Sequence, residues 1–258
     1  MPDDKEHQEN ITITSNEIKE LKRVFRKLCF FAEKAPKIER MKDINSKIVD
    51  LKRLGDEYSS SIEPKDDANE VIILEEELKK LQLELKEIES RTEQHIRPKD
   101  AGYAMKSLGK PMTKREIQDL IWEVDEKVDG VIDWQEFKLM FERNVKDTSG
   151  LEPSSFYMMV QFMIYDRDDN GKVSVDETMN MLYGRVGRQK MEESITKLFG
   201  GEDGSPIVEV GYQGGEIDFE HFWTVSEVEQ RKLFDSSELG RNMAEKKGTK
   251  RSPAKGYH

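Results

Sequence analysis

A twelve-residue segment from Asp166 to Glu177 restricts the fold of this chain more than any other feature. Oxygen-bearing side chains stand at its positions 1, 3, 5, 9 and 12, and glycine stands at position 6. Calcium takes about six to eight oxygen ligands, and protein loops that bind it use this spacing, with a backbone carbonyl from position 7. The segment therefore predicts a Ca2+ site. The expected ligands are Asp166, Asp168, Asn170, the carbonyl of Lys172, Ser174 directly or through a water, and Glu177.

The segments on both sides of this loop have helical periodicity. Met158, Phe162 and Tyr165 precede it at helical spacing, and Met179 and Leu182 follow it in the same way. Two helices joined by the loop would make its oxygens converge on one ion. The alternative, an acidic surface turn between two helices, needs no such convergence.

A second loop, Asp125 to Glu136, keeps the pattern except at position 3. Position 3 is Lys127, which removes one oxygen and adds a positive charge that repels a divalent cation at short range. Either Lys127 points outward into water and the loop binds an ion weakly, or the loop binds no ion and braces its two helices. The candidate ligands of this doubtful site are Asp125, Asp129, the carbonyl of Val131, Asp133 and Glu136.

An earlier segment keeps the outline of such a loop without its ligands. With Ile96 at position 8, this segment runs from Glu89 to Asp100. Position 3 is Arg91 and position 6 is Gln94, so neither an oxygen ligand nor the turn glycine is present where an ion needs it. No calcium is expected there.

A fourth loop is recognisable near the other end of the chain. Residues 215–222 repeat residues 130–137 position by position, but His221 replaces the final carboxylate, and a Gly-rich insertion (200–214) precedes them. No calcium is expected there either. One helix-loop-helix unit cannot bury its apolar faces alone, so such units pair through a short antiparallel contact at position 8. We therefore expect contacts between Ile96 and Ile132 and between Val173 and Ile217.

The N-terminal third is predicted to be helical. Thr14 and Glu17 have the spacing of a capping box, so a helix begins there, and Pro36 is expected to interrupt it. Residues 19–53 carry excess positive charge and residues 63–93 excess negative charge. A coiled coil or helical hairpin whose arms attract each other fits this pattern, as do a solvated helix and a coiled coil with another protein. The heptad positions are Val71, Leu74, Leu78, Leu81, Leu85 and Ile88.

Composition limits the classes of function. The net charge of -11 over 258 residues argues against a broad nucleic-acid-binding surface and suits cations and basic partner helices. The single cysteine, Cys29, cannot form an intramolecular disulfide, and no segment approaches the roughly 20 apolar residues of a membrane span. We therefore expect a cytoplasmic protein without nucleic-acid or membrane partners. No nucleophile has a base beside it in the sequence pattern, so we expect no enzyme activity and no catalytic residues.

The loop from Asp166 to Glu177, with Ile96 and the sequence Ser107-Leu108-Gly109, resembles the calmodulin and troponin C superfamily of EF-hand proteins. The resemblance extends over roughly residues 85–223. It implies an all-α fold with four EF-hands in two paired lobes, short antiparallel strand contacts between loops, and Ca2+ as the cofactor. It also implies a Met-rich groove that binds a partner helix. The methionines around the competent loop are Met158, Met159, Met163, Met179, Met181 and Met191.

This resemblance divides the chain into five parts. Residues 1–13 are expected to be disordered, 14–88 to form a coiled coil or helical hairpin, 89–147 and 148–234 to form the two EF-hand lobes, and 235–258 to be a basic disordered tail.

Two functions fit these features. The first is a calcium-binding sensor or adaptor that its coiled coil anchors to a larger assembly. EF-hands behind a charged coiled coil resemble the calcium-responsive subunits of dynein docking and regulatory complexes, which suggests a ciliary or flagellar axoneme as the location. The second is a constitutive structural subunit of a cytoskeletal complex, in which the EF-hands pack helices without calcium.

Overall fold

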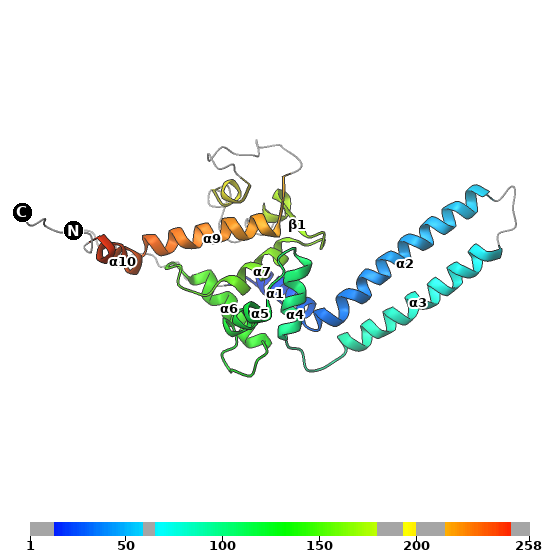
Figure 1. Ribbon diagram of the computed structural model, residues 1–258, viewed down its shortest axis with the longest axis horizontal. Coiled ribbons are helices and arrows are strands. Elements are labelled where there is room, and N and C mark those ends of the chain that lie inside the picture. Colours follow the sequence, from blue (N-terminus) through cyan, green and yellow to red (C-terminus); the bar gives the residue numbers. More distant parts are fainter. Residues whose placement is uncertain (1–12, 59–64, 180–192, 200–214, 249–258) are drawn as a thin grey trace, which may run out of the picture.

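The computed structural model describes residues 13–58, 65–179, 193–199 and 215–248. Figure 1 shows a helical body from which a two-helix arm projects on one side and the last two helices on the other. The predicted all-α class is confirmed, since one two-stranded sheet is the only sheet in the described residues. The elements are α1 (Ser15–Leu28), α2 (Phe31–Tyr58), α3 (Lys65–Glu89), α4 (Pro98–Ser107), α5 (Lys114–Trp122), α6 (Trp134–Lys146), α7 (Ser155–Tyr165), β1 (Lys172–Ser174), β2 (Glu216–Asp218), α9 (Phe219–Ser236) and α10 (Glu238–Gly248).

Four helix-loop-helix units follow one another, and we number them hands 1 to 4. Hand 1 joins α3 to α4, hand 2 joins α5 to α6, hand 3 joins α7 to helical residues 175–179, and hand 4 joins helical residues 193–199 to α9. Their loops pair as predicted. Ile96 and Ile132 exchange two backbone hydrogen bonds of 2.8 and 2.9 Å, and Val173 lies opposite Ile217 in the antiparallel β1–β2 ladder.

One apolar core runs through both pairs of hands. The rings of Phe137 in α6 and Phe156 in α7 meet edge to face at 6.2 Å, which joins hand 2 to hand 3. Within the second pair, the ring of Phe162 lies 5.1 Å from that of Phe219. The two pairs of hands are the two lobes that the resemblance implies, and they pack against each other through this core.

Helix α1 belongs to this core and not to the arm. Its capping box is present, because Thr14 Oγ1 accepts a bond from the Glu17 amide and the Glu17 carboxylate accepts one from the Thr14 amide. Leu21, Val24 and Leu28 are completely buried in the body, where α1 contacts α4, α6 and α7. The prediction that residues 14–28 belong to the hairpin is therefore wrong, because helical periodicity does not reveal which partner an apolar face packs against.

The helix break lies at Cys29 and Phe30, so the prediction of an interruption at Pro36 is wrong. Phe30 has a φ of 58°, and its buried ring lies beneath the guanidinium groups of Arg91 and Arg97, at 4.9 and 4.7 Å. Pro36 lies inside α2, and the helix continues past it to Tyr58.

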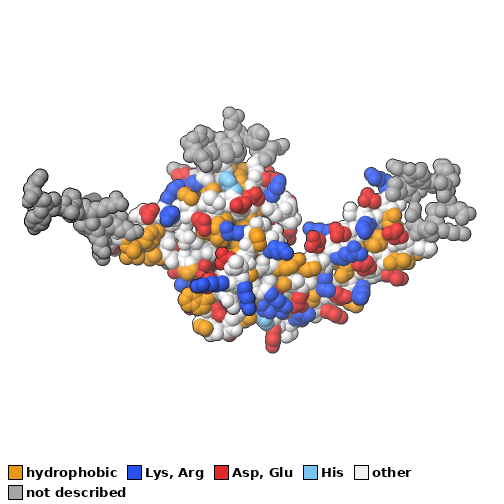
Figure 2. Space-filling view, in the orientation of Figure 1, with side chains coloured by type: hydrophobic (Ala, Val, Ile, Leu, Met, Phe, Trp, Pro, Cys, Tyr) orange, Lys and Arg blue, Asp and Glu red, His pale blue; other side chains and the backbone are white. Residues whose placement is uncertain are grey.

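Helices α2 and α3 form a helical hairpin along the arm. Ile44, Ile48 and Leu74 are buried between them, flanked by heptad residues of α3. The expected attraction between the arms is present in three ion pairs: a two-bond contact of 2.8 and 3.0 Å between Arg40 and Glu77, one of 3.1 Å between Lys52 and Glu75, and one between Lys37 and Glu84. Figure 2 shows positive, negative and apolar side chains mixed along the arm.

The root of the hairpin is fastened to hand 1. Helix α3 itself is the entering helix of hand 1, and Ile88 in its last turn lies in the body core. The Glu33 carboxylate at the start of α2 accepts bonds from Arg91, Arg97 and Lys99, at 2.8, 2.9 and 3.0 Å. The bond from Lys99, followed by those from Arg91 and Arg97, lowers the pKa of Glu33 to about 2.

At the C-terminal end, residues 238–248 are helical where a disordered tail was predicted. The Ser237 hydroxyl accepts a hydrogen bond of 3.1 Å from the Gly240 amide, which satisfies an amide in the first turn of α10. The predictions of disorder for residues 1–12 and 249–258, and of an insertion at 200–214, lie outside the described residues. Among the described helices, none has both the length and the apolar character needed to cross a bilayer.

The substitution Glu33→Gln tests the joint between hairpin and body. The folded-state pKa of about 2 lies below the ordinary 4.5, so the charge stabilises the fold above pH 4.5, and this contribution is lost as the pH falls toward 2. We expect the substitution to lower the free energy of unfolding by about 1 kcal/mol near neutral pH. The difference from the unmodified chain should shrink across that acid window in denaturant titrations. The control is Glu39→Gln, an equal charge change on an exposed residue of α2; an equal loss in both variants would contradict the prediction.

Candidate metal centre

The loop of hand 3 has the backbone that curls around a cation. Helix α7 ends at Tyr165, and Asp166 begins the loop. Asp169 and Gly171, at positions 4 and 6, have φ angles of 59° and 82°, in the left-handed region that makes a sharp turn. Asp166 then accepts backbone bonds of 3.0 Å from Asn170 and 3.1 Å from Gly171. The local sequence thus folds the chain back toward its own first carboxylate.

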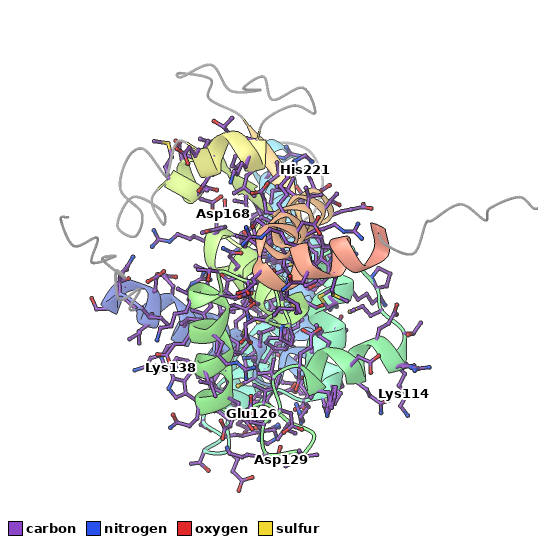
Figure 3. The ribbon with its side chains drawn as sticks, turned by 90° about the vertical axis from the view of Figure 1, so that its left-hand side faces the viewer. Lys114, Glu126, Asp129, Lys138, Asp168 and His221 are labelled. Atoms are coloured by element: carbon purple, nitrogen blue, oxygen red, sulfur yellow. The ribbon has the colours of Figure 1, made fainter. Side chains whose placement is uncertain are left out.

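Three carboxylates converge inside this loop. One oxygen each from Asp166, Asp168 and Glu177 lies within 4.8 Å of the others, and this is the only such group of three among the described residues. Glu177 reaches back across the loop, accepting a 3.0 Å bond from the Arg167 amide and a 2.8 Å bond from the Ser174 hydroxyl. Figure 3 labels Asp168 near the upper end of the body.

Two of the other predicted ligands, Asn170 and Lys172, have different partners. The Asn170 side chain donates to Asp168 at 3.1 Å, so Asn170 joins the cluster as Ser174 does. Lys172 lies in β1, and its ammonium points to Glu216 across the ladder at 3.1 Å. Its side chain therefore brings no positive charge into the ring of carboxylates.

The electrostatics of the cluster favour a cation. Asp166 is only 3% exposed, and burial raises its pKa, although bonds from Gly171 and Asn170 act in the opposite direction. Burial also opposes the ionised form of Glu177, but bonds from Ser174 and Arg167 outweigh it and lower its pKa. A buried carboxylate with a raised pKa has lost water without gaining a full positive partner. A hard divalent cation held by oxygen donors supplies that partner, so these residues fit Ca2+.

The loop of hand 2 has the same backbone as that of hand 3. Val128 and Gly130, at positions 4 and 6, have φ angles of 58° and 83°. Asp125 accepts bonds of 3.2 Å from the Asp129 amide and 2.7 Å from the Gly130 amide, as Asp166 does in hand 3. Figure 3 places Asp129 at the lower end of the body, on the side opposite Asp168. The missing ligand therefore leaves the loop conformation unchanged.

Lys127 folds into the second loop. Its ammonium contacts the Asp133 carboxylate and lies 4.0 Å from Glu136 Oε2. Its hydrogen bond to Asp133 raises the pKa of Lys127; burial opposes the ionised form of Asp133, but the same bond and those from backbone amides lower its pKa. The side chain thus brings a positive charge to two of the doubtful ligands, while the Val131 amide donates to Asp129 at 3.1 Å. Of the two interpretations of this loop, the geometry favours the one in which it binds no ion and braces its two helices.

Hands 1 and 4 use their last loop position for protein contacts. In hand 1, Asp100 is completely buried and accepts bonds from Arg97 Nε at 2.8 Å and from the Ala32 amide of α2 at 3.0 Å. In hand 4, His221 Nε2 lies 3.1 Å from the carbonyl oxygen of Leu198 at the end of the entering helix. The loss of ion ligands in both loops follows from the sequence, but these contacts do not, because Ala32 and Leu198 are distant from Asp100 and His221 in the chain.

Similarity to known proteins agrees with this architecture. Residues 103–144 match the EF-hand domain pair family. The probable calcium-binding protein CML13 of Oryza sativa subsp. japonica is 30% identical over 128 residues, which are 49% of this chain and 68% of that protein. The chain belongs to the calmodulin-like EF-hand family. A second relative of this calmodulin-like protein is the probable calcium-binding protein CML25 of Arabidopsis thaliana, 29% identical over 57% of this chain and 72% of its own length.

The described residues include only some of the methionines expected around the predicted Met-rich groove. Met158, Met159 and Met163 are buried in the core, and Met179 is exposed. Met181 and Met191 lie outside the described residues. A groove of about 320 Å³ lies between α7, residues 193–199 and α9. Its lining mixes apolar residues, Met158 among them, with polar and aromatic ones.

Glu177→Gln and Glu136→Gln form a matched pair that tests which loop of this EF-hand protein binds calcium. Each removes one carboxylate from position 12 and keeps the shape of the side chain. We expect Glu177→Gln to weaken Ca2+ binding at least about tenfold and Glu136→Gln to change it little, because Glu136 faces a protein ammonium. Isothermal titration calorimetry measures both affinities. Equal effects would mean that the two loops share the ion binding.

Lys127→Asp tests whether the lysine is what keeps an ion out of hand 2. The change removes the ammonium and restores an oxygen at position 3, while the loop keeps its turns. We expect one additional Ca2+ per chain by calorimetry. The control Lys114→Asp makes the same charge change on the exposed first residue of α5 and should add no site. Unchanged stoichiometry in Lys127→Asp would assign the loss of binding to another part of the loop.

Proposed function

We propose that this calmodulin-like protein is a calcium-sensing adaptor in which hand 3 binds the ion and the hairpin attaches the chain to a larger assembly. The convergence of Asp166, Asp168 and Glu177 in one turn carries the proposal. Ca2+ is the cofactor, since the donor set fits it and the relatives' names describe probable calcium-binding proteins.

The hairpin supports the anchoring part of the proposal. It projects from the body and carries apolar side chains that do not face its own seam: Val49 is 65% exposed, Ile73 64% and Leu83 59%. A coiled coil or helix of a partner protein would cover them. We propose protein partners, and neither nucleic acid nor membrane, for a chain with net charge -11.

The assembly that we propose is cytoskeletal, with a ciliary or flagellar axoneme as the specific candidate and the cytoplasm as the wider location. The support is the order of parts, a charged helical arm followed by EF-hands with few intact ion sites. The location of the tagged full chain in ciliated cells tests this part, and exclusion from cilia would remove it. We propose no enzymatic activity, because the one thiol, Cys29, is buried, and burial raises its pKa to about 12.

A second function, a constitutive structural subunit, is favoured by one observation. Hands 1, 2 and 4 replace the ion or its last ligand with protein contacts, through Asp100, Lys127 and His221. Such hands hold their helices without calcium. In this alternative, hand 3 would carry a permanently bound ion or none.

Calcium titration of the purified chain separates the two functions. A sensor should bind Ca2+ at roughly micromolar concentration through hand 3 and change conformation on binding. Calorimetry measures the binding, and circular dichroism with amide hydrogen exchange measures the conformational response, with Glu177→Gln as the control. Binding without any conformational response would support the structural-subunit hypothesis, and absence of binding would rule out the sensor hypothesis.

A further inference from the structure

Helix α1 lies directly against the loop of hand 3. Its apolar face is buried in the core, where the ring of Phe25 is 5.2 Å from that of Phe137 and 5.5 Å from that of Trp134. Its polar face meets the end of α7 and the loop that follows. Figure 1 shows α1 inside the body, next to α7. Because the apolar face fixes α1 in place, the charges on its other face keep their positions beside the loop.

The contacts reach loop positions that do not bind the ion. Lys27 pairs with Asp169 at position 4, and Arg23 Nη1 lies 3.9 Å from the same carboxylate. Arg167 at position 2 lies 3.9 Å from Glu20, which also accepts a 2.7 Å bond from Arg23. Positions 1, 3 and 12 stay directed into the carboxylate cluster. Helix α1 therefore contacts the outer side of the loop and does not contact the carboxylates of the cluster through these ion pairs.

Arg23 also contacts the helix that leads into the loop. Its Nη2 atom donates to the carbonyl oxygens of Met163 and Ile164, at 2.8 and 3.3 Å. These carbonyls belong to the last turn of α7, which has no intrahelical partners for them and carries partial negative charge. The guanidinium group thus neutralises the negative end of α7 immediately before Asp166.

We propose that Arg23 and Lys27 lower the calcium affinity of hand 3, so that α1 sets the calcium concentration at which the loop fills. The proposal rests on the proposed function, in which hand 3 is the calcium site. Two fixed positive charges stand beside the ring of carboxylates that attracts the ion, and they neutralise Asp169 and the end of α7, which would otherwise add to that attraction.

The size of the effect follows from distance and exposure. The Lys27 and Arg23 side chains are 27% and 32% exposed, so water and salt screen their charges in part. A divalent ion feels twice the repulsion of a monovalent one at the same distance. Removing one of these charges should therefore raise calcium affinity by about three- to tenfold.

Helix α1 connects the loop of hand 3 to the hairpin, so the repulsion between its charges and the ion affects more than the loop. Helix α1 ends at Leu28, and the chain turns at Phe30 directly into the hairpin. Coupling between two events is reciprocal, so if α1 weakens calcium binding, bound calcium weakens the grip of α1 by the same factor. The state of hand 3 would thus act on the element that leads to the root of the proposed anchor.

The experiment compares calcium affinities of four full-length chains by calorimetry: the unmodified chain, Lys27→Gln, Lys27→Arg and Arg26→Gln. Arg26 is the matched control, because it is exposed on the same helix and its change alters net charge equally. We expect about three- to tenfold tighter binding in Lys27→Gln, near-normal binding in Lys27→Arg and Arg26→Gln, and a smaller gain in Lys27→Gln at high salt. Thermal unfolding of each chain without calcium verifies that all are folded.

Each result has one interpretation. Equal affinity in Lys27→Gln and Arg26→Gln overturns the proposal, because only net charge would then matter. Weaker binding in Lys27→Gln overturns it as well, since α1 would then organise the loop for the ion. If neither the unmodified chain nor Lys27→Gln binds calcium, the proposed function itself is wrong. Calorimetry of the unmodified chain alone detects that outcome.

Discussion

The antiparallel contact between paired loops is the constraint on which the rest of this structure depends. Ile96 bonds to Ile132 and Val173 lies opposite Ile217, and each contact brings two helix-loop-helix units together so that their apolar faces close over one core. The contact uses backbone atoms and a buried side chain at position 8, and none of the ion's ligands. Folding therefore depends on position 8 and the helix faces, and the pairing of two hands does not require ion ligands in both of them.

Each hand that departs from the calcium pattern has filled the vacated role with a protein group. Hand 2 supplies a positive charge of its own in Lys127, hand 1 turns its last carboxylate toward the first turn of α2 through Asp100, and hand 4 ties its two helices together through His221. These are different chemical solutions to one problem, the cost of leaving a loop carboxylate or a helix end without a partner. Hand 3 differs because its buried Asp166 still has a raised pKa and no lysine folded among its carboxylates.

The parts of this architecture that could be predicted depend on residues close together in the sequence. The spacing within residues 166–177 predicted the curl of hand 3, and the position-8 residues predicted both pairings, because loop geometry is local and repeated. The place of α1 could not be predicted, since an apolar stripe such as Leu21, Val24 and Leu28 fits a hairpin and a core equally well. The inward position of the Lys127 side chain depends on which nearby carboxylates its ammonium contacts. Asp100 has a partner that is 68 positions away in the chain. Side-chain choices of this kind follow from tertiary packing, which periodicity does not encode.

The contacts at the root of the hairpin determine how a single calcium site can affect the rest of the molecule. Helix α3 continues without a break from the hairpin seam into hand 1, and Glu33 binds three cations of that hand, so both helices of the arm are fastened to hand 1. Hand 1 is paired with hand 2, whose internal lysine fixes its loop independently of calcium. The first pair and the arm are thus held together by contacts that involve no ion, and hand 3 is the one described loop in which three carboxylates converge. Helix α1 contacts both this frame and hand 3, with Phe25 against the α6 side and Lys27 at the loop of hand 3, so it is a second link beside the direct contact between α6 and α7.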